Sequence, residues 1–187
     1  MKITLINPPH TAIGSRIPDE HLPPLGLLSV GGPLVEIARQ VQLLDTNVVM
    51  IGHSGSSTAH PTIVELSRLL KLAMPELTIV YGGVHPTYHW DEILRECADI
   101  DIIVRGEGEE TALRLMHTLE SGDDLDELQG IAFRRDGEVV ATPPAMMIRD
   151  LDAYRIGWEL IDFSRYSYWG GKRTWHHFDG NVRRGLQ

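Results

Sequence analysis

Short, mainly apolar segments recur along this chain, and stretches with helical spacing of apolar residues separate most of them. Five such segments are predicted as strands: 3–6, 41–44, 48–51, 77–81 and 100–104. Because they lack a regular polar face, we expect these strands to be buried on both faces. Such strands alternating with helices indicate a doubly wound α/β fold, in which a parallel sheet is covered by helices on both sides.

The stretches between the strands predict four helices: 25–38, 61–72, 88–97 and 109–119. Beyond them, residues 130–134 and 138–141 flank Asp136-Gly137, a dipeptide typical of a tight β-hairpin turn. From Thr142 onward the chain is rich in proline and aromatic residues, which is typical of a linker. The sequence therefore predicts three parts: an α/β domain over 1–125, a β-hairpin extension over 126–150 and a linker over 151–187.

One link is too short for this topology. Only the residues Asp45-Thr46-Asn47 separate segment 41–44 from segment 48–51. Neighbouring parallel strands need a crossover of a dozen or more residues. Either one of these strands is misassigned or a crossover helix is missing. In the second case we expect an antiparallel or irregular second segment, or one longer bent strand over 41–51.

Composition excludes several classes of protein. The formal net charge of −9 argues against a nucleic-acid partner, because a phosphate backbone demands a basic face. No run of about 18 apolar residues occurs, so no membrane span is expected. The apolar run at the N-terminus is too short for a signal peptide, which favours a cytoplasmic location. A single cysteine, Cys97, cannot form an intrachain disulfide or a cysteine-rich metal or cluster site.

The loops after the predicted strands carry the candidate site. In an open α/β sheet, ligands bind beyond the carboxyl ends of the strands. These loops are rich in glycine, which lets backbone approach a flat ligand, and in short hydroxyl side chains that can form hydrogen bonds. The composition suits a large planar cofactor rich in amides, although ordinary turns use the same residues. The candidate cofactor-binding residues are Asn7, Pro8, Pro9, His10, His53, Ser54, Ser56, Ser57, Gly82, Gly83, His85, Thr87 and Glu107.

Phosphate-binding signatures are absent from the sequence. There is no Walker motif, and Gly106-Glu107-Gly108 lacks a third glycine and would repel a pyrophosphate. Its glutamates instead complement the N-terminus of the following helix. A flavin or nucleotide is therefore disfavoured as the ligand.

Four motifs resemble the N-terminal domain of cobalamin-dependent radical S-adenosylmethionine enzymes. They are Asn7-Pro8-Pro9, Pro23-Pro24-Leu25-Gly26-Leu27, Gly82-Gly83-x-His85-Pro86-Thr87 and Arg105-Gly106-Glu107-Gly108-Glu109. Ser56 precedes Gly82 by 26 positions, which is similar to the spacing in corrinoid proteins. Segments 10–18, 52–56, 158–162 and 166–171 are similar to the anaerobic magnesium-protoporphyrin IX monomethyl ester oxidative cyclases of bacteriochlorophyll biosynthesis. The resemblance covers residues 1–173 and implies a flavodoxin-like domain that binds cobalamin.

The family's activity is implied by this resemblance alone. Its members close the isocyclic ring of a magnesium-porphyrin substrate with oxygen from water, using cobalamin, S-adenosylmethionine and a 4Fe-4S cluster. Three cysteines in a following radical barrel domain hold that cluster, and this chain has no such motif. We therefore expect a truncated member that binds cobalamin and does not catalyse the reaction alone. The alternative is an interaction or regulatory module that keeps the fold without a cofactor.

The chain departs from the family pattern at its end, where the cysteine motif is also missing, and at one link. Residues 174–187 do not resemble the family's continuation, and the link after Asn47 lacks a helix that family members carry. His10 is the nearest candidate for a cobalt ligand, but corrinoid mutases carry D-x-H-x-x-G and this loop lacks the aspartate. A carboxylate normally orients such a histidine, so cobalamin bound without a protein imidazole is favoured. His53 and His85 are expected to form hydrogen bonds or to pack.

Overall fold

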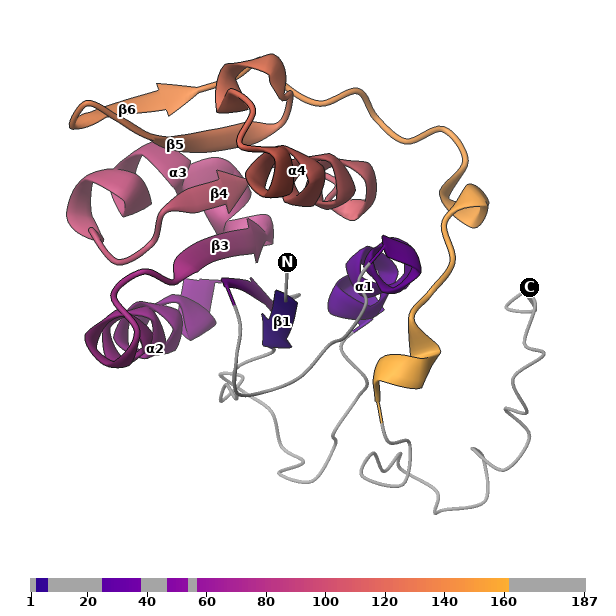
Figure 1. Ribbon diagram of the computed structural model, residues 1–187, viewed down its shortest axis with the longest axis horizontal. Coiled ribbons are helices and arrows are strands. Elements are labelled where there is room, and N and C mark those ends of the chain that lie inside the picture. The colour runs from indigo at the N-terminus through magenta and orange to yellow at the C-terminus, as the bar shows by residue number, and fades with distance from the viewer. Residues whose placement is uncertain (1–2, 7–24, 38–46, 54–56, 162–187) are drawn as a thin grey trace.

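A single mixed sheet organises the chain in the computed structural model, which describes residues 3–6, 25–37, 47–53 and 57–161 (Figure 1). Four strands run parallel and lie side by side in chain order: β1 (Ile3–Ile6), β2 (Val48–His53), β3 (Thr78–Gly83) and β4 (Ile102–Val104). The helices are α1 (Leu25–Ile37), α2 (His60–Ala73), α3 (Val84–Glu96) and α4 (Glu109–Ser121). None of the described helices is long and apolar enough to cross a membrane.

The helices form two layers, with α1 and α4 on one face of the sheet and α2 and α3 on the other (Figure 1). Alternate residues of each strand pack toward the two helical layers. On β3, Val80 packs with Leu115 of α4, while Ile79 packs with Ile63 of α2. Full burial of each such side chain contributes about 1.5–3 kcal/mol. The doubly wound α/β fold predicted from the apolar strands is confirmed, as is the flavodoxin-like type that the resemblance implied.

The predicted hairpin is also confirmed. Strands β5 (Ile131–Arg135) and β6 (Glu138–Ala141) pair antiparallel around Asp136-Gly137. Both turn residues have positive φ, 51° and 86°, as a two-residue hairpin turn with the favoured twist requires. Because β5 pairs antiparallel with β4, the hairpin extends the parallel sheet itself.

The structure describes only the end of the short link that follows the predicted second strand. Segment 41–44 lies outside the described residues. The alternative of one longer, bent strand over 41–51 therefore also reaches outside the described part of the chain, within which a bend at Asn47 directly precedes β2. β2 pairs with β1, in parallel.

The connection from β1 to β2 has an unusual hand. From β1 to β4 the chain steps in one direction across the sheet, yet α1 lies on the face opposite α2 and α3. Two crossover connections that move in the same direction across the sheet, but whose helices lie on opposite faces of it, must have opposite handedness. Since about 98% of such crossovers are right-handed, a single crossover through α1 would be the left-handed exception.

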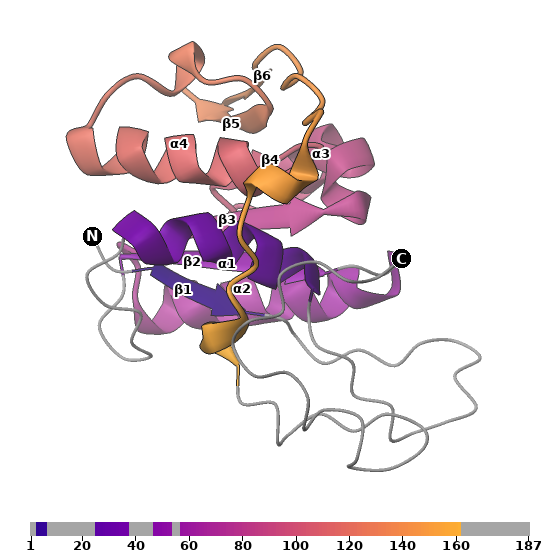
Figure 2. The ribbon, with the colours of Figure 1, turned by 90° about the vertical axis from the view of Figure 1, so that its right-hand side faces the viewer.

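Residues 142–161, here called the strap, leave the hairpin, pass the start of α4 and cross α1 (Figure 2). Gly157 donates its backbone N–H to the carbonyl of Leu28 at 2.8 Å. The backbones of strap and helix are so close that a Cβ on Gly32 would lie 2.0 Å from the carbonyl oxygen of Arg155. This approach explains why α1 tolerates a glycine pair that weakens a helix.

Candidate cofactor-binding site

The carboxyl edge of the parallel strands brings together residues from different parts of the chain. In the register of the sheet, Gly52 lies beside Gly82 and His53 lies beside Gly83. On the other side of β3, Gly82 is the partner of Val104. The sequence-predicted residues His53, Gly82 and Gly83 therefore do meet at one edge. The side chain of His53 is outside the described part of the structure.

Along β3, Val80 belongs to the core under α1 and α4, and Tyr81 belongs to the core under α2 and α3. Gly82 lies two positions after Val80 and therefore on the side of the sheet that α1 and α4 cover. Among the residues that the structure describes, a Cβ placed on Gly82 would have one neighbour within 4 Å, the Cβ of Val104 at 3.8 Å, which is ordinary van der Waals contact. The fold therefore does not itself require glycine here. A glycine inside a strand often marks a place where a ligand approaches the backbone.

Gly52 is the residue that the sequence-based site omitted. It is the register partner of Gly82, so two glycines stand side by side near the ends of adjacent strands. The available signal was a glycine inside an otherwise apolar segment, but the pairing across strands becomes visible only when the register is known.

Gly83 has a different reason to be glycine. Its φ of 118° and ψ of −172° belong to a backbone region that residues other than glycine rarely adopt. This conformation turns the chain from β3 directly into α3, at whose first turn Thr87 lies. The hydroxyl of Thr87 donates to the carbonyl of Gly83 at 2.8 Å and accepts from the N–H of Gly106 at 3.0 Å. Thr87 thus ties the loops after β3 and β4 together.

His85 lies inside a stack of imidazole rings. Its ring centroid is 4.6 Å from that of His60 and 4.6 Å from that of His89. The Nδ1 atoms of His60 and His85 are buried and have no hydrogen-bond partner among the described residues. Burial lowers the pKa of both imidazoles, and the adjacent His60 lowers the pKa of His85 further. Both rings are therefore expected to be neutral near neutral pH. The prediction that His85 packs agrees with this stack.

Glu107 contacts the strap. Its Oε2 accepts the backbone N–H of Ile148 in the strap at 2.6 Å. Ser57 is exposed at the start of the short helix Ser57–Ala59, between β2 and α2. The remaining candidates, Asn7, Pro8, Pro9, His10, Ser54 and Ser56, lie outside the described residues. No group of three or more potential ligands in the described ranges could hold a metal ion.

The sequence of this chain matches a known protein family. Residues 21–116 match the family model described as the B12 binding domain, and the match includes Gly52, Gly82, Gly83 and Thr87. The chain belongs to the B12-binding domain family. The resemblance that the motifs suggested is confirmed at this level.

Curated relatives extend the comparison. This B12-binding domain is 51% identical to an anaerobic magnesium-protoporphyrin IX monomethyl ester cyclase of Synechocystis, over 93% of the chain and 39% of the relative. It is 36% identical to the cyclase of the same name from Rubrivivax gelatinosus, over 61% of the chain and 22% of that relative. The domain therefore spans well under half the length of the curated cyclases it matches.

Solved structures agree on the fold. The radical S-adenosylmethionine methyltransferase TsrM from Kitasatospora setae, solved with cobalamin and a 4Fe-4S cluster, matches with a TM-score of 0.63. That match is 17% identical and covers 79% of this chain and 30% of TsrM. The cobalamin-dependent radical enzyme OxsB matches with a TM-score of 0.59 at 20% identity, over 78% of this chain and 22% of OxsB. At these identities the likeness concerns the fold alone.

The alignments with two relatives are longer than the part of this chain that they cover. The Synechocystis match runs over 193 residues but uses 93% of the 187 residues here, about 174, so about 19 positions of the relative have no counterpart. A methyltransferase of Pyrococcus horikoshii, 28% identical, gives the same difference: 185 residues against 89% of this chain, about 166. A difference of about 19 positions is the length of a helix with its turns.

Proposed function

We propose that this B12-binding domain holds cobalamin at the carboxyl edge of β2, β3 and β4. The observation that carries the proposal is the pair Gly52 and Gly82, adjacent in the sheet, with room for a Cβ in front of Gly82. Two glycines side by side on neighbouring strands leave a flat patch of backbone without side chains. Such a surface suits a broad, amide-rich ligand better than a small phosphate.

The residues around this surface have separate roles in the proposal. Gly83 and Thr87 shape the edge, since the hydroxyl of Thr87 fixes the loop after β4 relative to the end of β3. His53 and Ser57, which flank the loop after β2, would supply polar contacts. Bound cobalamin would contribute a redox-active cobalt, whose axial ligand this proposal does not assign to any protein imidazole.

We also propose that the domain serves an anaerobic magnesium-protoporphyrin IX monomethyl ester cyclase activity in the cytoplasm. The 51% identity to the Synechocystis relative supports this function. The oxidative closure of the isocyclic ring would then need a radical S-adenosylmethionine domain that supplies the 4Fe-4S cluster. Cys97, the one thiol in the chain, cannot hold that cluster.

The test is the uptake of hydroxocobalamin by the purified chain. Equilibrium dialysis is expected to show one equivalent bound, with an absorption spectrum altered from that of the free cofactor. Flavin mononucleotide, offered under the same conditions, is expected to remain free. Absence of cobalamin uptake would instead favour a cofactor-free interaction or regulatory module with the same fold.

A further inference from the structure

Two methionines stand out on the surface of the strap. Met146 is 85% exposed and its neighbour Met147 is 81% exposed. These adjacent apolar side chains bury little of their surface, although fully burying a methionine contributes about 1.5–3 kcal/mol. Methionine is also common on surfaces that bind a partner, because its unbranched side chain adapts to the opposite face.

The backbone on both sides of these methionines is held in place. Before them, the carbonyl of Pro143 accepts from the N–H of Gly130 at 2.8 Å, and that of Thr142 accepts from Nη1 of Arg105 at 3.1 Å. After them, the N–H of Ile148 donates to Glu107 at 2.6 Å. Because anchors flank the pair closely, the methionines are displayed at a defined position and do not hang on a loose tail.

The anchors also give the position of the pair relative to the proposed cofactor. Arg105 and Glu107 belong to the loop that follows β4, and Thr87 bonds the same loop to the end of β3. The strap therefore starts at the carboxyl edge of the sheet, beside the proposed cobalamin surface. A domain that must reach the cofactor would approach the molecule from this edge.

We propose that Met146 and Met147 are the docking point for the catalytic domain that makes up the rest of the longer relatives. The length of chain involved supports this occupant, since this chain matches only 39% of the Synechocystis cyclase. Charged residues of both signs, Arg149 and Asp150, follow the pair, so the facing surface should offer an apolar hollow for the two methionines. The identity of the occupant rests on the proposed function, whereas the docking surface rests on the exposed, anchored methionines.

The experiment uses a hybrid protein in which this chain replaces the matching stretch of the Synechocystis cyclase. The isolated chain and the hybrid are both treated with dilute hydrogen peroxide, which converts exposed methionine to its sulfoxide. Mass spectrometry then follows each methionine separately. We expect Met146 and Met147 to oxidise at least fivefold more slowly in the hybrid.

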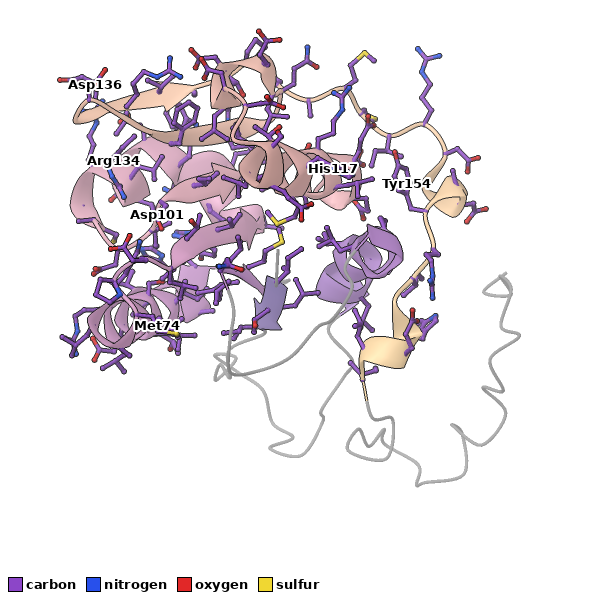
Figure 3. All side chains as sticks on the ribbon, in the orientation of Figure 1. Met74, Asp101, His117, Arg134, Asp136 and Tyr154 are labelled. Carbon is purple, nitrogen blue, oxygen red and sulfur yellow. The ribbon has the colours of Figure 1, made fainter. Side chains whose placement is uncertain are left out.

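Met74 provides the internal control. It is 37% exposed and lies beyond the end of α2, far from Tyr154 of the strap (Figure 3). Its rate should be equal in the two proteins. Equal rates for Met146 and Met147 in both proteins would overturn the proposal. Protection that already occurs in the isolated chain at high concentration would also overturn it, because a second copy would then be the occupant.

A pair of variants of the hybrid separates docking from cofactor binding. Met146→Ser with Met147→Ser should make the junction between the domains at least fivefold more sensitive to limited proteolysis, while cobalamin remains bound. Leu72→Ser, at a residue that is also exposed but lies on α2, should leave this sensitivity unchanged. Loss of cobalamin from the unaltered hybrid would contradict the proposed function but not the docking surface.

Discussion

Gly82 and Val104 face each other on adjacent strands, and a Cβ added to Gly82 would lie at an ordinary 3.8 Å from the Cβ of Val104. This relationship separates the needs of the fold from those of a ligand. The sheet accepts a side chain at this position, and glycine within a strand is unfavourable in itself. The glycine is therefore explained better by what must lie in front of it.

The first prediction follows from this contact. Gly82→Val should weaken the binding of hydroxocobalamin at least tenfold, about 1.4 kcal/mol, because the added methyl groups occupy the proposed ligand surface. Its urea midpoint should equal or exceed that of the wild type. Equilibrium dialysis and urea unfolding measure the two quantities. Thr78→Val, at the opposite end of β3, is the control and should bind normally; equal binding by the Gly82 variant would remove this residue from the site.

Replacing the adjacent Gly83 should lower the stability of the chain itself. Gly83→Ala forces a side chain into a conformation with φ of 118°, and such strain destabilises a protein by about 1–3 kcal/mol. We expect a lower urea midpoint even without cobalamin, in contrast to Gly82→Ala. Unfolding curves of the two alanine variants decide the matter. An unchanged midpoint for Gly83→Ala would show that the turn into α3 relaxes.

Arg134 is expected to hold the hairpin to the end of α3. Its guanidinium donates to the carbonyls of Leu94 at 2.7 Å and Ala98 at 2.9 Å, and also to those of Cys97 and Ile100 (Figure 3). Arg134→Met leaves these partly buried acceptors without their charged donor. The loss should be about 1.5–3 kcal/mol, measured by urea unfolding.

The neighbouring arginine gives a matched control for that variant. Arg135 forms ion pairs with Asp124 and Asp126 at the surface. Exposed pairs of this kind contribute about 0–1 kcal/mol. Arg135→Met should therefore change stability little. If the two variants lost equal stability, the bonds from Arg134 to the carbonyls would not be the cause.

The histidine stack should make stability depend on pH. Burial lowers the pKa of His60 and His85, while the carboxylate of Glu92 opposes this shift and His89 adds to it. The unfolded chain therefore takes up protons on these rings near the ordinary imidazole pKa of about 6.5, and the folded protein does so only at lower pH. Their contribution to stability is present above the ordinary pKa and is lost as the pH falls toward the folded value.

Thermal unfolding provides the measurement. The Tm should fall between about pH 7.5 and pH 5.5, and the double variant His60→Phe, His85→Phe should show a smaller fall because its rings do not titrate. Comparing the two proteins removes the effect of the carboxylates, which they share. Identical pH profiles would contradict the lowered pKa of His60 and His85, because stability depends on pH only where the pKa differs between the folded and unfolded chain.

A helix inserted after Asn47 should stabilise the chain. The odd hand of the β1–α1–β2 connection indicates a missing crossover, and the difference of about 19 alignment positions is long enough to contain one. With a helix-length insertion, the chain could visit a further edge strand and return to β2 through two right-handed crossovers. We expect a higher urea midpoint for this variant. An insertion of equal length made of glycine and serine, the control, should not raise it, and an unaltered midpoint for the helical insertion would mark the short link as native.

Local patterns in the sequence determined most of the fold. The apolar segments around Val48, Thr78 and Ile102 predicted buried parallel strands, and Asp136-Gly137 predicted the hairpin, because strand burial and turn dihedrals depend on neighbouring residues. Only the tertiary structure decided how distant residues meet. It paired Gly52 with Gly82, directed Glu107 to Ile148 in the strap and placed α1 on its face of the sheet. These relationships depend on strand register and on contacts between residues far apart in the chain, which no local periodicity encodes.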